Sequence, residues 1–371
     1  LGQVVRSNRI SYGPFSQSFE SEFAKAHHSR FAIFMNSGTS ALHVALQALK
    51  EKYDWSDGDE VLVPAVTFVA TANVCLHNRL VPKFVDVNPQ SYNIDVNQIE
   101  RHITKRTRAI MPVHVAGLAC DMTEICQIAA AHKLRILEDA CEAAFTEHNG
   151  RRVGSFGDAG CYSTYICHHI TTGVGGLAVT DDPDLAVRIR SLANHGRDAI
   201  YIKPEDGRDH KGRSSREVIE KRFSFTSIGH SFRCTEFEAA LGLAQLEDVE
   251  KNIKARQENA KRLTEGLESL SYFLQLPILS GSTSMFYPIL ARSGKVDLVN
   301  HLEANGIETR DLLPIVSQPC YRKMFKNLEA EYPNAARIAH RGFYIGSHPL
   351  MTKKDTDKIV RTIKNFYAGA H

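Results

Sequence analysis

A segment rich in hydroxyl groups, Asn36-Ser37-Gly38-Thr39-Ser40, stands where a β-type run ends and a helical pattern begins. The N-terminus of a helix presents free backbone N–H groups and the positive end of the helix dipole, and both favour a bound phosphate group. The same segment also suits an ordinary helix N-cap, in which a Ser or Thr hydroxyl accepts a hydrogen bond from the first turn. By itself the segment leaves both interpretations open.

An acidic residue, Asp139, comes near the end of the apolar run 135–140, which predicts a buried strand. In α/β proteins the carboxyl ends of the parallel strands form the edge of the sheet where ligands bind. A carboxylate at that edge can pair with a protonated ring nitrogen. A lone Asp at the end of a strand also serves as a turn or cap residue, and that alternative stays open.

Two adjacent histidines, His168 and His169, lie among hydroxyl and glycine residues between 160 and 176. They make a poor metal site, because neighbouring side chains of an extended segment point in opposite directions and no third ligand has a suitable spacing. One buried and one solvated histidine is the usual arrangement of such a pair. The segment ends in Gly175-Gly176, which predicts a turn that leads back into a strand.

The elements that must position these residues follow an order that is typical of α/β proteins. Between residues 30 and 145, β-type runs alternate with helical patterns, and the runs are apolar almost throughout, as strands covered on both faces require. Residues 1–240 are therefore expected to form a large α/β domain with a mostly parallel sheet. Its first strands are expected at residues 30–35, 59–66, 81–87, 108–115 and 135–140.

The rest of the chain, residues 241–371, predicts a small C-terminal α+β domain with a connecting helix. One long helix is expected from Thr235 to about Leu270, where helix-forming residues carry regularly spaced apolar side chains. Before it, residues 203–217 are polar and rich in Gly, which predicts a long mobile loop. Beyond the long helix, strands and helices are expected at 286–291, 295–307, 342–346 and 354–367.

The composition is that of an ordinary globular protein. The 371 residues, 43% hydrophobic and 23% charged, suffice for about two domains with a large buried core. A net charge of +3, without a basic run interleaved with aromatic residues, argues against nucleic acid as a partner. No apolar stretch of about 18 residues predicts a membrane span, and the first residues lack a signal-peptide pattern. Eight cysteines spread singly through the chain are expected to be reduced thiols of a cytoplasmic protein.

Taken in this order, the segments resemble the DegT/DnrJ/EryC1/StrS group, a family of sugar aminotransferase-like pyridoxal-phosphate (PLP) proteins with the aspartate aminotransferase fold. The resemblance implies a large PLP-transferase domain with a mostly parallel mixed sheet and a small C-terminal α+β domain. It also implies a homodimer with sites at the subunit interface. The resemblance covers nearly the whole chain and rests on residues 11–42, 59–74, 137–145, 157–165 and 231–247.

The resemblance implies roles for residues at matching positions. Gly38, Thr39 and Ser163 would bind the phosphate of the cofactor. Phe68 would stack on its pyridine ring, with core packing as the alternative. Asp139 would keep the ring nitrogen protonated, so that the ring accepts electrons.

One position departs from the aminotransferases of this family. Those enzymes have a Lys seven residues before the glycine pair, which binds the cofactor covalently, whereas this sequence has His168 there. An imidazole cannot form that bond, and no other Lys stands between Lys133 and Lys203. In having a His at this position, the sequence resembles the GDP-4-keto-6-deoxymannose 3-dehydratase branch of the family.

Three more positions bear on that resemblance. Glu142, where the aminotransferases commonly have Gln, and His195 also match the dehydratase branch. Both are predicted to contact the cofactor or the sugar, with buried structural hydrogen bonds as the alternative. Ser231 stands where the partner subunit of family members adds an Asn to the phosphate site. A related iron–sulfur dehydrase has a cysteine cluster after the segment that matches residues 195–198; this sequence has none there, so no cluster is expected.

The reaction that the resemblance implies is removal of the C3 hydroxyl from a nucleotide-linked 4-keto-6-deoxyhexose, in deoxysugar biosynthesis. Pyridoxamine phosphate (PMP) would be held noncovalently, and glutamate would regenerate it. His168 would move the proton, a task that suits an imidazole with an ordinary pKa of about 6.5. Two alternatives stay open: a nucleotide-sugar aminotransferase, native or with its Lys replaced, and a catalytically silent relative that binds the cofactor or a nucleotide-sugar.

Overall fold

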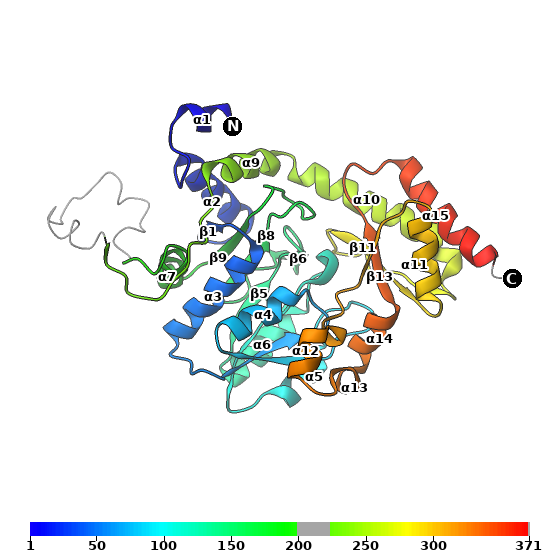
Figure 1. Cartoon of the computed structure of the whole chain (residues 1–371), viewed down its shortest axis with the longest axis horizontal. Coiled ribbons are helices and arrows are strands. Elements are labelled where there is room, and N and C mark those ends of the chain that lie inside the picture. Colours follow the sequence, from blue (N-terminus) through cyan, green and yellow to red (C-terminus); the bar gives the residue numbers. More distant parts are fainter. Residues whose placement is uncertain (199–222, 370–371) are drawn as a thin grey trace.

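The computed structural model describes residues 1–198 and 223–369, so the loop predicted at 203–217 lies outside the described residues. Two larger sheets organise the chain (Figure 1). A seven-stranded sheet is built from residues 31–180, and a four-stranded sheet from residues 274–346.

The seven-stranded sheet has the order β1-β9-β8-β5-β4-β2-β3. Its middle and one flank are parallel, whereas β9 pairs antiparallel with both β8 and β1. The prediction of a mostly parallel mixed sheet is therefore confirmed, and each strand expected up to residue 140 is present. The strands are β1 (Phe31–Met35), β2 (Glu60–Pro64), β3 (Val81–Val85), β4 (Thr107–Ile110), β5 (Arg135–Asp139), β8 (Ala159–Ser163) and β9 (Gly176–Thr180).

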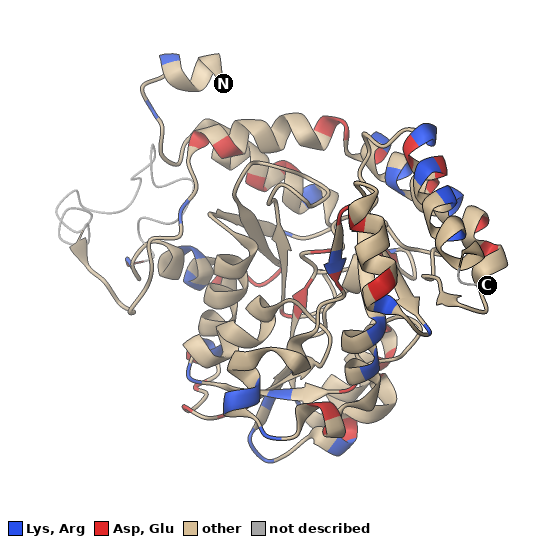
Figure 2. Cartoon of the chain, turned by 45° about the vertical axis from the view of Figure 1, so that its right-hand side comes forward, with Lys and Arg blue, Asp and Glu red and all other residues tan. Residues whose placement is uncertain are grey.

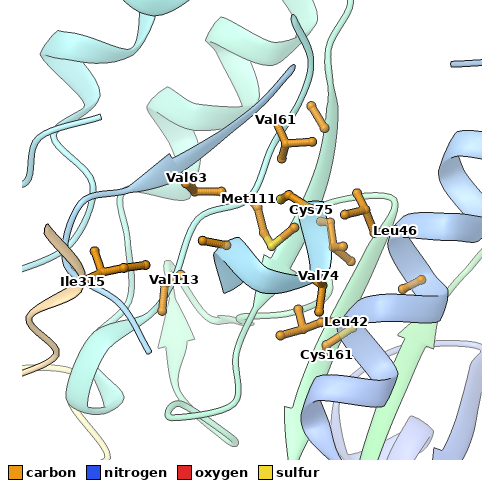
Figure 3. Packing of buried hydrophobic residues seen from close by; sticks show 14 of the residues in the cluster. Leu42, Leu46, Val61, Val63, Val74, Cys75, Met111, Val113, Cys161 and Ile315 are labelled. Atoms are coloured by element: carbon orange, nitrogen blue, oxygen red, sulfur yellow. The ribbon is translucent and has the colours of Figure 1, made fainter. Parts of the chain in front are cut away.

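Helices cover both faces of this sheet, as its apolar strands require. Neighbouring residues of β2 point to opposite sides: Val61 and Val63 pack with Leu42 of α3 and Cys75 of α4 (Figure 3). Leu62 packs in a separate cluster with residues of α6. The helices before and around the sheet are α1 (Gly2–Arg6), α2 (Pro14–Ala26), α3 (Gly38–Lys52), α4 (Val69–His77), α5 (Val96–Ile99), α6 (Met122–His132) and α7 (Pro183–Ala193).

The four-stranded sheet has the order β10-β11-β13-β12, and its strands pair antiparallel. Helices α10 (Val249–Leu267), α11 and α15 lie beside it and share a separate apolar cluster with it (Figure 1). This arrangement is the α+β unit expected near the C-terminus, while the domain boundary at residue 240 stays a prediction. The elements are β10 (Leu274–Gln275), β11 (Phe286–Ala291), α11 (Lys295–Ala304), β12 (Thr309–Asp311), α12 (Pro319–Met324), α13 (Leu328–Glu331), α14 (Pro333–Arg341), β13 (Gly342–Gly346) and α15 (Lys353–Ala368).

The expectation of one helix from Thr235 to about Leu270 is wrong. Two helices, α9 (Glu236–Glu247) and α10 (Val249–Leu267), are separated by Asp248, whose φ of −102° and ψ of 3° interrupt the helix. Helix α9 packs on α2, beside the large sheet, whereas α10 packs on α15, beside the small one. The break therefore lets the chain change its packing partner.

Glu138 of β5 is a fully buried carboxylate that no sequence motif revealed. Its oxygens accept hydrogen bonds from the backbone N–H groups of Gly154, Phe156 and Gly157, at 2.6, 2.6 and 2.8 Å. The His114 ring lies 3.2 Å from the same carboxylate. Glu138 therefore ties the chain that leads into β8 to the centre of the large sheet.

Replacing Glu138 by Gln is expected to lower the free energy of unfolding by about 2 kcal/mol. The NH2 group of the Gln side chain would face backbone N–H groups that then have no acceptor. Denaturant unfolding would measure the loss. Glu147→Gln, on an exposed residue whose carboxylate pairs with Arg152, is the matched control and should change stability by less than about 0.5 kcal/mol. Equal losses in the two variants would contradict the role of Glu138.

The outer surface carries charges of both signs. Lys, Arg, Asp and Glu are interspersed along the helix that ends at the C-terminus (Figure 2). Within residues 1–198 and 223–369, no helix is long and apolar enough to cross a membrane. All eight cysteines are free thiols.

Candidate functional site

A cavity of about 360 Å³ lies at the carboxyl edge of the large sheet, and its volume is in the range of small-molecule sites. Strands β5 and β8, the N-terminus of α3, and the segment before α4 contribute to its walls. The structure brings together most of the site residues that the sequence predicts, namely Gly38, Thr39, Phe68, Asp139, Glu142, Ser163 and His168.

Helix α3 begins at this cavity with Ser37 as its N-cap. The Ser37 hydroxyl accepts a hydrogen bond from the Ser40 N–H at 3.0 Å, so the interpretation as a cap is correct. The N–H groups of Gly38 and Thr39 have no acceptor within the helix, and both residues line the cavity. The segment is therefore a cap that also leaves donors for an anion.

Two glycines let the backbone segments approach closely at this point. A Cβ on Gly38 would lie 2.9 Å from both Cys141 Sγ and Ser163 Cβ. A Cβ on Gly176 would lie 2.3 Å from the backbone nitrogen of Gly38. The glycine pair at the start of β9 thus allows this strand to run beside the first turn of α3, which brings Ser163 next to Gly38.

Asp139 ends β5 and is buried at the cavity wall. Its carboxylate accepts hydrogen bonds from the Thr71 hydroxyl at 2.8 Å and from the Cys141 N–H at 3.2 Å. Burial raises the pKa of Asp139 despite these bonds, because the charged form loses its hydration. A cationic ring nitrogen in the cavity would favour the charged carboxylate, so Asp139 is suited to bind one.

Phe68 precedes α4 and is 59% exposed at the wall of the cavity. It does not pack in the core, which was the alternative for this residue. An exposed aromatic ring beside a cavity offers a flat surface on which another ring can stack.

His168 lies in the loop between β8 and β9, which is closed by backbone hydrogen bonds from Thr164 to Gly175 and from Thr172 to Thr164, both 2.9 Å long. The ring nitrogen Nδ1 lies 2.7 Å from the Cys141 carbonyl oxygen. Because a carbonyl can only accept, Nδ1 carries the hydrogen and Nε2 keeps its lone pair. Burial lowers the pKa of His168 to about 4, so the ring is neutral at neutral pH.

Glu142 directly follows Cys141 in the sequence and is buried at the cavity wall. Its carboxyl group accepts a hydrogen bond from the Ala116 N–H at 2.9 Å. Burial raises its pKa to about 8. At neutral pH this side chain is therefore mainly protonated, and it can donate a hydrogen bond as well as accept one.

His195 and Ser231 lie outside the cavity of their own chain. Both side chains are exposed and lie beside Arg233, whose Nη2 donates to Ser231 Oγ at 3.1 Å and is 3.4 Å from His195 Nε2. The two residues are therefore neighbours of each other, but the structure does not bring them to the other predicted site residues.

The opposite wall of the cavity comes from the small sheet and the segments around it, and the sequence analysis missed it. Phe286 of β11 and Tyr344 of β13 stack with ring centroids 4.2 Å apart, and Met285 and Leu313 complete this side. Alternating aromatic and aliphatic residues in a strand look like core residues. Only the packing of the small sheet against the large one shows that they line a cavity.

Comparison with known proteins agrees with this architecture. A family model described as the DegT/DnrJ/EryC1/StrS aminotransferase family matches residues 1–364. The dTDP-4-dehydro-2,6-dideoxy-D-glucose 3-dehydratase of Saccharopolyspora spinosa is 35% identical over 389 residues, which cover 99% of this chain and 83% of that protein. The GDP-perosamine synthase of Escherichia coli O157:H7 is 32% identical over 366 residues, covering 96% of this chain and 92% of that protein.

A solved structure shares the whole fold. GDP-4-keto-6-deoxymannose-3-dehydratase with a trapped PLP-glutamate geminal diamine superposes with a TM-score of 0.89 and 26% sequence identity, covering 98% of this chain and 95% of that chain. The predicted resemblance and fold are thus confirmed by a match along nearly the full sequence. The chain belongs to the DegT/DnrJ/EryC1/StrS aminotransferase family.

Proposed function

We propose that this protein is a PLP/PMP-dependent dehydratase that removes the C3 hydroxyl from a nucleotide-linked 4-keto-6-deoxyhexose, in cytoplasmic deoxysugar biosynthesis. The family includes 3-dehydratases and aminotransferases, so membership alone does not choose between them. The observation that carries the proposal is His168. It stands where the aminotransferases have their Lys, and its hydrogen bond to Cys141 leaves Nε2 as a base in the cavity.

The residues present fit the cofactor. The N–H groups of Gly38 and Thr39 and the hydroxyl of Ser163 would hold its phosphate at the α3 N-terminus. Asp139 would accept the hydrogen of the protonated ring nitrogen, and Phe68 would stack on the ring. When bound, the amine form of the cofactor supplies the nitrogen that joins the sugar ketone and a ring that accepts electrons.

His168 would act as the proton carrier, first as a base and then as an acid. Its neutral ring takes up a proton at Nε2, and the lowered pKa of about 4 then makes the protonated ring a strong donor to the departing C3 hydroxyl. Glu142, protonated at neutral pH, would orient the sugar through a hydrogen bond. His168 would carry the proton again when glutamate regenerates the amine form.

A second copy of the chain would complete the site. Large apolar side chains are exposed around the cavity, among them Phe68, Tyr165 and Val174, and an exposed apolar patch of this kind suits a subunit interface. Ser231 and His195 are exposed and lie outside the cavity of their own chain, and they would reach that of the partner. These features support a homodimer with composite sites.

Phe68→Ala is expected to weaken cofactor binding about fivefold, because a stacked aromatic pair contributes about 1 kcal/mol. The free energy of unfolding should stay unchanged, since the ring is 59% exposed. An absorbance titration with PLP measures the affinity. Phe223→Ala removes another exposed ring, one outside the cavity, and should leave the affinity as it is; equal affinities in wild type and Phe68→Ala would refute the stacking role.

The test of the proposed function is to load the protein with PLP and glutamate, then add GDP- or dTDP-4-keto-6-deoxyhexose. Conversion of the aldehyde absorbance to that of the amine form, a product lighter by one oxygen, and free ammonia are expected. The relative trapped with PLP and glutamate supports glutamate as the donor. New nitrogen at C4 would instead show an aminotransferase. Binding without turnover would show a silent relative.

A further inference from the structure

We propose that Arg256 is a positioning residue for His168: its guanidinium group holds the backbone carbonyl of His168 at the junction of the two sheets. The proposal rests on the proposed function of His168 as the proton carrier. Arg256 belongs to α10, far from His168 in sequence, and it does not line the cavity.

The hydrogen bonds of Arg256 join three segments of the chain. Nη2 donates to the His168 carbonyl at 3.1 Å, and Nη1 donates to the Met285 and Ser347 carbonyls at 2.7 and 3.0 Å. The Ser347 hydroxyl in turn donates to the Arg256 carbonyl at 3.1 Å. One side chain thus connects the β8–β9 loop with the residue before β11 and the residue after β13.

This arrangement is costly for a buried cation. Arg256 is 5% exposed, and a buried charge usually has a partner of opposite sign. Within residues 1–198 and 223–369 the guanidinium bonds to carbonyl oxygens rather than to a carboxylate, and its Nε is without an acceptor. Burial lowers the pKa of Arg256 to about 10. An apolar side chain at residue 256 would avoid this cost. We therefore attribute the presence of an arginine to the relative positions that its hydrogen bonds impose on the three segments.

The position of the His168 ring is set at two points. The Cys141 carbonyl holds the side chain through Nδ1 at 2.7 Å, and Arg256 holds the main chain of the same residue at 3.1 Å. Without the second bond, the loop can shift relative to the small-sheet wall of the cavity. A displacement of about 1 Å in a catalytic group costs about a hundredfold in rate.

Arg256 also acts on the charge of the ring. Burial is the largest cause of the lowered pKa of His168, the Cys141 carbonyl opposes it, and the positive charge of Arg256 lowers the pKa further. The other titratable groups near His168, Arg256 and the adjoining cavity wall come from three places. They are Tyr165, Cys167 and His169 of the β8–β9 loop, Asp139, Cys141 and Glu142 at the end of β5 and just after it, and Tyr344 and His348 in and after β13.

The test compares Arg256→Met, which loses the charge and the donors, with Arg256→Lys, which keeps the charge but replaces the planar guanidinium group by a single ammonium group that cannot reproduce the bonds to three carbonyls. In the protein without cofactor, NMR would follow the pKa of the His168 ring and the exchange of its Nδ1–H with water; His168→Asn identifies the signals. In Arg256→Met the pKa should rise from about 4 toward its usual value of about 6.5, and exchange should quicken at least tenfold. In Arg256→Lys the pKa should stay near that of wild type while exchange still quickens.

Turnover of the keto-sugar is the second readout. We expect kcat to fall about a hundredfold in Arg256→Met and by a smaller factor in Arg256→Lys. KM should stay within about threefold of wild type in both, because Arg256 itself does not line the cavity. The matched control is Asn259→Ala, on the next turn of α10. Its buried amide donates to the His348 carbonyl at 3.0 Å, so the variant weakens the same helix contact without touching His168, and both readouts should match wild type.

A folded Arg256→Met protein with wild-type His168 signals and wild-type kcat would overturn the proposal. If Arg256→Met does not fold, Arg256→Lys decides: wild-type exchange of Nδ1–H and wild-type kcat would refute the positioning role. Failure of the proposed function is distinguishable, because it shows as absence of turnover in the wild-type protein, whereas the NMR readout needs neither cofactor nor substrate.

Discussion

His168→Asn is expected to reduce kcat for sugar dehydration by about 10²- to 10⁴-fold, the usual contribution of a general acid–base group. The Asn amide can still donate to the Cys141 carbonyl in place of Nδ1, so the loop should keep its conformation. What the variant loses is the titratable Nε2. Steady-state kinetics measure kcat, and a PLP titration should show an affinity within about threefold of wild type, because the phosphate and ring contacts of the cofactor remain.

A matched control for this variant is His102→Asn. The His102 ring makes the same type of bond, with Nδ1 2.8 Å from the Gln98 carbonyl, but it lies outside the cavity. Its kcat should equal that of wild type. A His168→Asn protein that keeps more than about a tenth of wild-type kcat would show that His168 is not the proton carrier. Loss of a general acid–base group lowers kcat by at least about a hundredfold.

Glu142→Gln is expected to remove a large pH dependence of stability. The folded carboxyl group keeps its proton up to a pKa of about 8, whereas the ordinary value is 4.5. Between these values the folded state binds more protons than the unfolded state, so the free energy of unfolding falls as pH rises. One pH unit corresponds to about 1.4 kcal/mol, and the whole interval to about 5 kcal/mol for this group.

The cleanest window for this measurement is pH 6.5 to 8. His168 and other buried histidines with lowered pKa values, such as His27 and His43, destabilise the protein at lower pH and so oppose the trend there. Above about pH 6.5 they are mostly neutral in both states. Denaturant unfolding should show that, from pH 6.5 to 8, the free energy of unfolding of wild type falls by about 2 kcal/mol relative to that of Glu142→Gln.

The control for the pH experiment is Glu22→Gln, on an exposed residue of α2. Its stability curve should run parallel to that of wild type from pH 6.5 to 8. A parallel curve for Glu142→Gln as well would mean that the Glu142 carboxyl group ionises in the folded protein near its usual pKa, and its proposed role as a neutral donor to the sugar would fall.

Much of the large domain was determined by the sequence itself. Apolar runs separated by helical patterns predict strands and helices from local spacing, and the ends of the runs place Gly38 and Asp139 at one edge of a sheet. The place of Ser163 at the site was implied by the resemblance to the family. The resemblance to the family also implies that His168 stands at the position of the aminotransferase Lys. The structure confirms the mixed sheet and brings these residues to one cavity.

Only the tertiary structure decided how these groups behave. The Cys141 carbonyl sets the tautomer of His168, and burial sets the pKa values of His168 and Glu142. Segments distant in sequence also pack together at three further places. These are the small-sheet wall of the cavity, the hydrogen bonds of Arg256 and the helix break at Asp248. Desolvation and close packing depend on all surrounding groups at once, and local spacing along a chain does not contain that information.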